Sequence, residues 1–357
     1  MSGRLRRVDC SAPGISRRRR GRGFEYLDQD ETRVEDPEVL ERIGELVIPP
    51  AWKDVWICPY PMGHIQATGI DARGRKQYVY HRKWRERRDQ EKFDEMVRFA
   101  RCLPDLRKRV KRDLRRDELD QERVLACAVR LLDRGFFRIG GEDYAESNDS
   151  YGLATMRKEH VTLTEPDLIR FDYPAKSGKR REQSIVDPEV FDIVQTLKRR
   201  RGGGEELLAY KEGRLWTDVR SEDINGYIKA VAHEDFSAKA FRTWNATLLA
   251  SVALAVSGPA AQQSKTARKR AVTHAVKEVA HYLGNTPAVC RASYIDPRVF
   301  DRFDSGLTIS GVLPQLGDEP DLASIHGAAE EAVLDLIAKD EDSDHVEPVD
   351  ELEKLAA

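Results

Sequence analysis

The chain has 357 residues, of which 40% are apolar and 34% charged, a composition that describes a soluble protein with room for two domains. Its longest apolar run, residues 246–256, is too short to span a bilayer, and no apolar stretch follows the N-terminal arginines as it would in a secretory signal. Five scattered cysteines without a CxxC pair argue against a zinc site or a disulfide framework, so we expect a reducing, cytoplasmic location.

The net charge of −2 conceals an uneven distribution. Residues 317–357 hold 14 Asp and Glu against 2 Lys, so the remainder of the chain carries a net charge of +10. The stretch 82–116 has 15 Lys and Arg against 7 Asp and Glu, and "SRRRRGRG" (16–23) is basic as well. Such a body favours a polyanionic partner, nucleic acid first, although a surface of mixed ion pairs would also explain it.

The first part of the chain predicts a small β-rich domain. Residues 1–23 are expected to form a disordered basic arm. Residues 24–86 contain short strand-like runs punctuated by Pro and Gly, namely "LVIPPAW", "DVWICPY", "GHIQATGID" and "KQYVYH". Segments with helical periodicity, rich in Arg, Glu and Leu, begin near residues 83–90, which we take as the domain boundary.

The second predicted domain, residues 87–316, is mainly α-helical. A short segment of predicted strands interrupts it at residues 160–187, where "AKSGKR" favours a tight hairpin. Residues 240–256 predict a buried helix with an arginine near its start, and residues 266–284 predict an amphipathic helix. The acidic residues 317–357 are expected to form a tail with one helix at most, over "ASIHGAAEEAVLDLIAK", and a disordered end. The predicted fold class is therefore α+β with two domains.

Five polar side chains stand at the edges of well-patterned elements. Arg138 follows an apolar helix, Lys176 lies at the tip of the predicted hairpin, and Arg242 begins a very apolar helix, where an unpaired charge is costly. Tyr294 closes the segment "LGNTPAVCRASY", in which Thr-Pro predicts the start of a short helix, and Asn285 precedes it by nine residues.

This set of residue types suits phosphodiester transfer to tyrosine. Guanidinium groups stabilise the negative charge on nonbridging oxygens, a lysine on a mobile tip can protonate the leaving oxygen, and tyrosine is a covalent nucleophile that conserves the phosphodiester energy. The sequence has no HxxxH, no carboxylate cluster and no Walker motif, so it indicates neither a metal nor ATP.

The same segments resemble a known family. "FFRIGGEDYAESNDSYGLATMRKEHV", "YPAKSGK", "FRTW" and "LGNTPAVCRASY" are similar to the type IB DNA topoisomerases of the small bacterial and poxvirus kind. "IPPAW" (48–52) and "GRKQYVYH" (74–81) resemble the β domain of that family, so the resemblance covers about residues 24–305.

The resemblance implies a role for each catalytic residue. Arg138 and Arg242 would be the two catalytic arginines, Lys176 the general acid and Tyr294 the nucleophile. The implied architecture is a DNA breaking-rejoining fold that closes as a clamp round duplex DNA. The implied activity is relaxation of positive and negative supercoils through a 3′-phosphotyrosyl break and strand rotation, without ATP or an essential metal. The expected partner is double-stranded DNA in the bacterial nucleoid, with no protein partner, and a monomer is the default.

The comparison with the family also suggests DNA contacts outside the catalytic set. Gln77, Tyr78 and Tyr80 resemble the strand that the family lays against the major groove, and Tyr144 lies on a segment that also meets DNA. Gln can pair with adenine, and Tyr can contact phosphate or thymine methyls. An ordinary alternating strand with aromatic residues is the alternative reading.

The sequence departs from the family pattern at two places. Asn285 stands where histidine is common; its amide still donates a hydrogen bond but cannot become charged, so we expect activity with less pH sensitivity. The hairpin reads "AKSGK" where many relatives have "GKSGK", and Lys179 is an alternative general acid.

Three other interpretations stay open at this stage. A tyrosine recombinase shares the catalytic logic but usually has histidine where this chain has Lys239, and it lacks the β-rich N-terminal domain. A non-catalytic DNA clamp would bind duplex in a salt-sensitive way and would not depend on Tyr294. The acidic tail would act either as a DNA mimic that folds onto the basic body or as a solubilising appendage.

Overall fold

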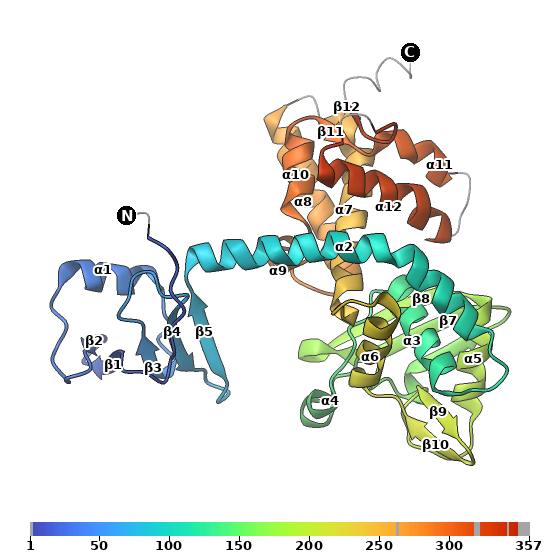
Figure 1. Ribbon diagram of the computed structural model, residues 1–357, viewed down its shortest axis with the longest axis horizontal. Helices are drawn as coiled ribbons and strands as arrows, with labels where there is room; N and C mark the ends of the chain where they lie inside the picture. The colour runs from blue at the N-terminus through green and yellow to red at the C-terminus, as the bar shows by residue number, and fades with distance from the viewer. Residues whose placement is uncertain (1–2, 262–263, 318–321, 341–342, 349–357) are drawn as a thin grey trace. The chain divides into compact units, whose positions relative to one another are not determined.

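The computed structural model describes residues 3–261, 264–317, 322–340 and 343–348 (Figure 1). The chain divides into two compact units, Met1–Asp94 and Glu95–Ala357, and the division falls within helix α2 (Arg82–Leu114), slightly after the boundary that the sequence predicts. The first unit is built on a β-sheet and the second is mainly helical with small sheets, so the predicted α+β class is confirmed. None of the described helices is both long and apolar enough to cross a membrane.

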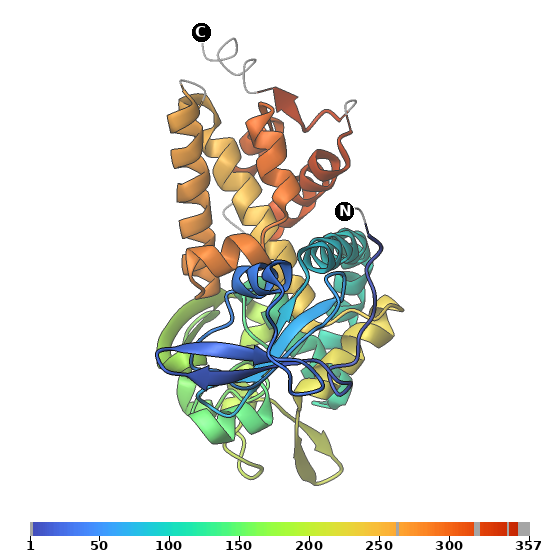
Figure 2. The ribbon, with the colours of Figure 1, turned by 90° about the vertical axis from the view of Figure 1, so that its left-hand side faces the viewer.

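The N-terminal unit is one antiparallel sheet with the strand order β2-β1-β3-β4-β5 and a single short helix of its own (Figure 2). The elements are β1 (Ile15–Arg20), β2 (Gly23–Leu27), α1 (Pro37–Glu45), β3 (Lys53–Ile57), β4 (Ile65–Ile70) and β5 (Lys76–Tyr80). Asp36 caps α1 by accepting a hydrogen bond from the backbone N–H of Glu38, and Pro37 occupies the first helical position. A small apolar cluster between α1 and the sheet includes Ile43, Ile57 and Ala67.

Two expectations for this unit are wrong. The arm at residues 1–23 was expected to be disordered, but β1 pairs with both β2 and β3. A strand accommodates its arginine run because alternate side chains face opposite sides, and Arg17 donates hydrogen bonds to three backbone carbonyls. Residues 46–52 were read as strand-like but form no strand, since adjacent prolines remove the N–H donors that a ladder requires.

The second unit is organised round the long helix α7 (Ala238–Ala261), which contacts α3, α8, α10 and α12. Its other helices are α3 (Gln121–Gly135), α4 (Glu142–Asn148), α5 (Pro188–Arg199), α6 (Ser221–Ala232), α8 (Lys265–Leu283), α9 (Pro287–Ser293), α10 (Pro297–Asp304), α11 (Leu313–Gly317) and α12 (Leu322–Ala338). Short 3₁₀ turns lie at η1 (Lys158–His160), η2 (Lys176–Gly178) and η3 (Ser310–Val312), and β9 (Ala209–Glu212) pairs with β10 (Leu215–Asp218). Phe99 packs edge-on against Phe236 and Phe241 at ring-centre distances of 5.3 and 4.8 Å, which joins α2 to the start of α7.

The predicted hairpin is present in a three-stranded sheet. The strands are β6 (Val161–Thr164), β7 (Leu168–Ala175) and β8 (Lys179–Val186), in the order β6-β7-β8. Ala175 pairs with Lys179 across a three-residue loop, and Gly178 takes the left-handed conformation that closes it (φ +70°). Phe171 of β7 packs edge-on against Phe137, just beyond α3, so the hairpin is fixed to the end of that helix.

The acidic segment does not form the expected tail over its described part. Helix α12 presents an apolar stripe at helical spacing, and all five of its members are buried: Ala329, Ala332, Val333, Leu336 and Ile337. Figures 1 and 2 show α12 beside α7 and α10, with which it is in contact. A two-residue strand, β12 (Glu347–Pro348), pairs with β11 (Leu307–Thr308). The disordered end that the sequence predicts falls mostly on residues 341–342 and 349–357, which lie outside the described residues.

Candidate active site

Tyr294 lies at the end of the short helix α9, as the sequence predicts. The hydroxyl of Thr286 caps the helix by accepting a hydrogen bond from the N–H of Val289 at 3.3 Å, and Tyr294 itself is the C-terminal cap. Helix α7 anchors the turn that follows: the hydroxyl of Thr247 lies 3.3 Å from the carbonyl oxygen of Tyr294 and accepts from the N–H of Asp296 at 3.1 Å. The position of the tyrosine backbone is therefore set by α7.

Arg242 lies near the start of α7 and is only 3% exposed. Its guanidinium donates to the carbonyl oxygens of Phe136 and Leu283, the latter at 2.9 Å. The same guanidinium lies 5.3 Å from the ring centre of Tyr294. Burial and the positive charge of Arg138 lower the pKa of Arg242 to about 10, so it remains protonated at neutral pH.

Arg138 follows α3, where the chain leaves the helix through Phe136 in the left-handed conformation (φ +54°). Its guanidinium donates to the carbonyl oxygen of Gly284 at 3.3 Å and to Oδ1 of Asn285. The hydrogen bonds of Arg138 and Arg242 thus go to neutral oxygens rather than to carboxylates. Their positive charges are not neutralised by these partners, which makes the site suited to an anion.

Asn285 is placed by the end of α8. Gly284 adopts the left-handed conformation (φ +62°) as the helix cap, and the N–H of Asn285 bonds back to the carbonyl of Ala280 at 3.0 Å. Because Oδ1 accepts from Arg138, the amide nitrogen Nδ2 points elsewhere, and it has no hydrogen-bond partner among the residues that the structure describes. A buried donor without a partner is available to an anionic oxygen.

A cavity of about 950 Å³ lies between the hairpin, the end of α3 and the end of α8, and neither Tyr294 nor Arg242 is among its lining residues. Arg138, Asn285, Lys176 and Lys179 all line it. Lys176 and Lys179 are both exposed, so the geometry leaves both of them open as the general acid. Arg242 lies next to the cavity: it donates to the carbonyl oxygen of residue 283, and Arg138, which lines the cavity, donates to that of residue 284.

The electrostatic environment favours ionisation of Tyr294. Burial opposes loss of its proton, but the positive charges of Arg242, Arg138 and Lys239 outweigh burial and lower the pKa of the phenol. A lowered pKa increases the fraction of phenolate, the nucleophilic form, at a given pH.

Sequence reasoning missed Arg181, another cationic residue at the cavity. It lies on β8 and donates to the carbonyl oxygens of His281 and Tyr282, so it ties the hairpin to the last turn of α8. The signal that could have found it is strand alternation, because Lys179, Arg181 and Gln183 share one face of β8.

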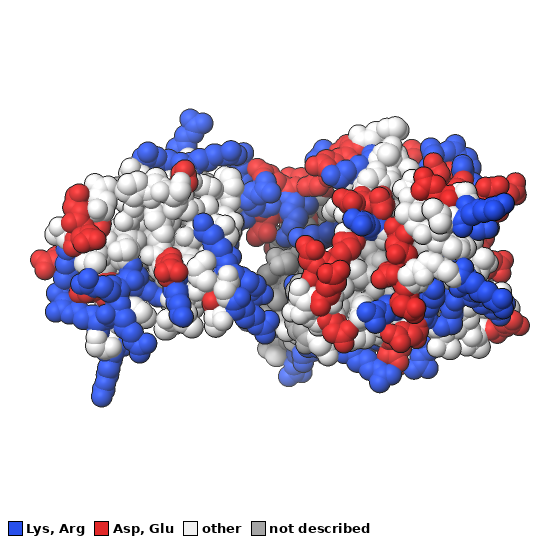
Figure 3. All heavy atoms as spheres, turned by 90° about the horizontal axis from the view of Figure 1, so that it is seen from below, with Lys and Arg blue, Asp and Glu red and all other residues white. Residues whose placement is uncertain are grey.

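The predicted DNA-facing residues do not all come together. Tyr78 and Tyr80 are exposed on the same face of β5, with their rings stacked at a centre distance of 5.9 Å. Gln77 lies on the opposite face, and its amide donates to the carboxylate of Asp71 at 3.0 Å. Tyr144 belongs to α4, but its side chain lies outside the described residues. In Figure 3 the charged side chains on the visible face of the N-terminal unit are mainly Lys and Arg, with fewer Asp and Glu.

Within the described ranges, no three His, Cys, Asp or Glu side chains are grouped so that they could hold a metal ion. The cavity is lined mainly by cationic and neutral side chains; its lining carboxylate, Glu182, is paired with Arg170.

A helical unit with a tyrosine beside two uncompensated arginines, joined to a small β-sheet unit, defines a DNA breaking-rejoining enzyme. Residues 81–305 match the family described as eukaryotic DNA topoisomerase I, catalytic core, and residues 23–71 match the bacterial DNA topoisomerase IB, N-terminal domain. The chain belongs to the type IB DNA topoisomerases, whose members relax DNA through a phosphotyrosyl intermediate.

Several curated proteins are similar to the chain. The DNA topoisomerase 1B of Acanthamoeba polyphaga mimivirus is 31% identical over 292 residues, which cover 79% of this chain and 85% of the viral protein. The DNA topoisomerase 1 of Candidozyma auris is 32% identical over 54% of this chain and 27% of its own length. The corresponding Schizosaccharomyces pombe enzyme is 32% identical over 44% of this chain and 19% of its own length. The chain therefore spans most of the viral relative but only a part of the two yeast enzymes.

Proposed function

We propose that Tyr294 is the nucleophile by which this topoisomerase breaks DNA. The observation that carries the proposal is the pairing of Tyr294 with Arg242, a buried guanidinium whose partners are all neutral and whose charge lowers the pKa of the phenol. In the proposed reaction the Tyr294 oxygen attacks a backbone phosphorus and loses its proton to solvent. The bond from phosphorus to the 5′ oxygen breaks, and the 3′ end stays attached to the tyrosine.

The other site residues act on the same phosphate in this proposal. Arg138 and Arg242 stabilise charge on the nonbridging oxygens, and the free Nδ2 of Asn285 adds a neutral donor. Lys176 gives a proton to the departing 5′ oxygen, and the reverse transfer reseals the strand after rotation. Because the phosphotyrosyl bond keeps the energy of the phosphodiester, the cycle requires neither ATP nor a metal ion.

The proposed substrate is double-stranded DNA, and the chain acts as a monomer in the bacterial cytoplasm because one chain supplies the whole set. Tyr78 and Tyr80 contact the duplex from the exposed face of β5, and Tyr144 contacts it from α4. For Gln77 to join them, its amide must exchange Asp71 for DNA.

The test is plasmid relaxation in EDTA without ATP, with wild type and Tyr294→Phe compared on a gel. We expect a ladder of relaxed topoisomers from wild type and none from the variant, which retains the ring but lacks the nucleophilic oxygen. Denaturing gels with labelled DNA should show a covalent protein-DNA adduct for wild type alone. Relaxation by Tyr294→Phe would show that another residue is the nucleophile, and site-specific strand exchange in place of relaxation would favour a recombinase.

The choice between Lys176 and Lys179 requires a leaving group that needs no proton. A substrate with sulfur at the 5′ bridging position leaves as a thiolate, so the loss of the true general acid should slow normal DNA strongly and the sulfur substrate little. We expect this pattern for Lys176→Met, while Lys179→Met should affect both substrates equally. The opposite pattern would assign the acid to Lys179.

A further inference from the structure

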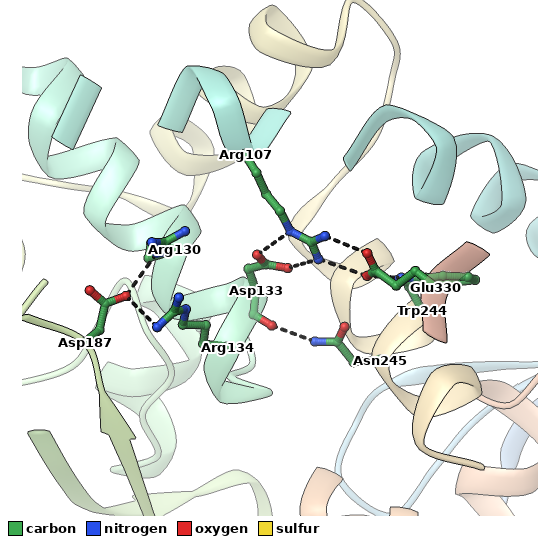
Figure 4. A network of polar contacts seen from close by, with 8 residues as sticks. All are labelled: Arg107, Arg130, Asp133, Arg134, Asp187, Trp244, Asn245 and Glu330. Carbon is green, nitrogen blue, oxygen red and sulfur yellow. Dashed lines mark hydrogen bonds and ion pairs between the residues drawn. The ribbon is translucent and has the colours of Figure 1, made fainter. Parts of the chain in front are cut away.

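Glu330 is a buried acid outside the segment that matches the catalytic core, residues 81–305. It lies on α12 and is 8% exposed, and both carboxylate oxygens are bound (Figure 4). Oε2 accepts from Nη1 of Arg107 at 2.6 Å, and Oε1 accepts from Nη2 of Arg107 at 2.9 Å and from Nε1 of Trp244 at 2.8 Å. The acidic C-terminal segment is therefore fixed to both α2 and α7.

Arg107 also holds a second carboxylate. Its Nε and Nη2 donate to Oδ2 and Oδ1 of Asp133, near the end of α3, at 2.8 and 2.9 Å. One guanidinium from α2 thus binds two carboxylates, one from α3 and one from α12, each through two hydrogen bonds. Paired contacts of this kind fix orientation as well as distance.

The network is adjacent to the two arginines of the active site. Trp244 follows Arg242 by two residues on α7, and Asn245 donates through its amide to the carbonyl oxygen of Asp133 at 2.9 Å. Asp133 in turn precedes Phe136, whose carbonyl oxygen accepts from Arg242, by one helical turn. The end of α3 and the start of α7, which present Arg138 and Arg242, are thereby held to each other and to α12.

We propose that Glu330 is a positioning residue for DNA cleavage: it fixes the N-terminal part of α7 through Trp244 and so sets the position of Arg242. The proposal rests on the proposed role of Arg242 at the phosphate. Arg242 bonds to carbonyl oxygens, and no carboxylate among the described residues holds it. Its orientation therefore depends on the backbones that supply those oxygens and on the helix that carries it. The acidic segment is then part of the catalytic unit rather than an appendage.

The test compares Glu330→Gln with Glu331→Gln. Glutamine keeps the shape of glutamate but turns an NH₂ group toward the donors of Arg107, whereas Glu331 is the exposed neighbour on the same helix and undergoes the same charge change. Single-turnover cleavage is measured with the enzyme in excess over a short duplex whose cleaved strand dissociates. We expect the rate constant of Glu330→Gln to fall roughly 10- to 100-fold with unchanged DNA affinity, and that of Glu331→Gln to equal wild type.

A purely structural role would give a different result. It would lower the melting temperature and the amount of active enzyme but not the rate constant, which does not depend on the folded fraction when enzyme is in excess. An unchanged rate constant would therefore overturn the proposal. If Glu330→Gln does not fold, Trp244→Phe tests the proposal instead. It removes only the Nε1 donor to Glu330 and leaves the pair of Glu330 with Arg107 intact, and we expect it to slow cleavage too.

A double-mutant cycle identifies the residue through which Glu330 acts. In an Arg242→Ala background, Glu330→Gln should have little further effect on the cleavage rate, because the group that it positions is gone. Fully additive losses would overturn the proposal. A normal rate for Arg242→Ala alone would instead refute the proposed function of Arg242, so the two failures are distinguishable.

Discussion

At the scale of single residues, the chemistry of Tyr294 depends on the charges that surround it. Burial alone would raise the pKa of the phenol, and three cations reverse that effect. Arg242 and Arg138 are held by fixed hydrogen bonds, whereas Lys239 is exposed on the first turn of α7. Lys239 is therefore the cation that can be removed with little disturbance of the fold.

Lys239→Gln should shift the pH dependence of cleavage. Loss of this positive charge raises the pKa of Tyr294, so the phenolate forms at higher pH. The rising part of the plot of cleavage rate against pH therefore shifts to higher pH. Single-turnover rates measured from about pH 6 to 10 should show the shift, which should diminish at high salt because the lysine is exposed. Lys277→Gln, an exposed lysine on α8, serves as the control and should leave the profile in place.

Asn285→His should introduce a pH dependence that the wild type lacks. The native amide stays neutral at every pH, while an imidazole at this position gains a proton near its usual pKa of about 6.5. We expect faster cleavage below about pH 6.5 than above it, superimposed on the tyrosine limb, because the protonated ring adds charge beside the phosphate. Asn285→Ala should slow cleavage about 10²-fold at all pH values. A ratio of cleavage rates between Asn285→His and wild type that does not change with pH would contradict this role for the position.

At the scale of elements, the most local features were predictable from the sequence. The end of α8 at Gly284 and the start of α9 at Thr286 and Pro287 each follow from neighbouring residues, so the turn that leads to Tyr294 was correctly predicted. The hairpin that carries Lys176 was predictable for the same reason.

Features that depend on distant partners were not predictable. Strand β1 has a run of four arginines that reads as a disordered arm, and only its pairing with β3 and the carbonyls that receive Arg17 make it a strand. Arg107 and Glu330 are 223 residues apart, and each alone resembles an ordinary charged helix residue. The face of β5 on which Gln77 lies was knowable from strand alternation, but its bond to Asp71 was not.

The loop after α5 illustrates how one buried charge can order an element. The glycines of residues 198–204, "KRRRGGG", are typical of a flexible loop. The guanidinium of Arg200 is nevertheless buried and donates to the carbonyl oxygens of Leu197, Gly204, Glu206 and Leu207. Those hydrogen bonds connect the loop to the helix before it and to the chain that leads into β9.

Arg200→Met should lower the free energy of unfolding by roughly 2–4 kcal/mol, because several buried carbonyls lose their donor at once. The measurement is thermal or urea unfolding followed by circular dichroism. Arg199→Met changes the same charge on the exposed neighbour and should shift stability by less than about 0.5 kcal/mol. Equal effects of the two substitutions would show that the hydrogen bonds of Arg200 contribute no special stability.

At the scale of the whole molecule, the C-terminal segment is part of the folded catalytic unit. Removing residues 318–357 would delete α12 with its five buried apolar side chains and would leave Arg107 and Asp133 without Glu330. We expect a loss of roughly 5 kcal/mol or more in unfolding free energy, with a clear fall in melting temperature.

The matched control for this truncation is removal of residues 349–357 alone, which keeps α12 and β12 and should leave the melting temperature nearly unchanged. A stable enzyme after loss of residues 318–357 would restore the interpretation of the segment as an appendage. Because that larger truncation also removes core packing, its effect on the salt dependence of DNA binding would not by itself report autoinhibition.

The position of Glu330 late in the chain has a consequence for the order of events during synthesis. All five residues of the proposed catalytic set have been translated once Tyr294 is added, yet Glu330 follows 36 residues later. At about 5–20 residues per second, the ribosome supplies it roughly 2–7 s afterwards. If Arg242 is aimed only when α12 docks, a nascent chain carries the nucleophile without an effective cleavage site. In that case the cell would be protected from a half-made enzyme that nicks its genome before it is able to reseal it.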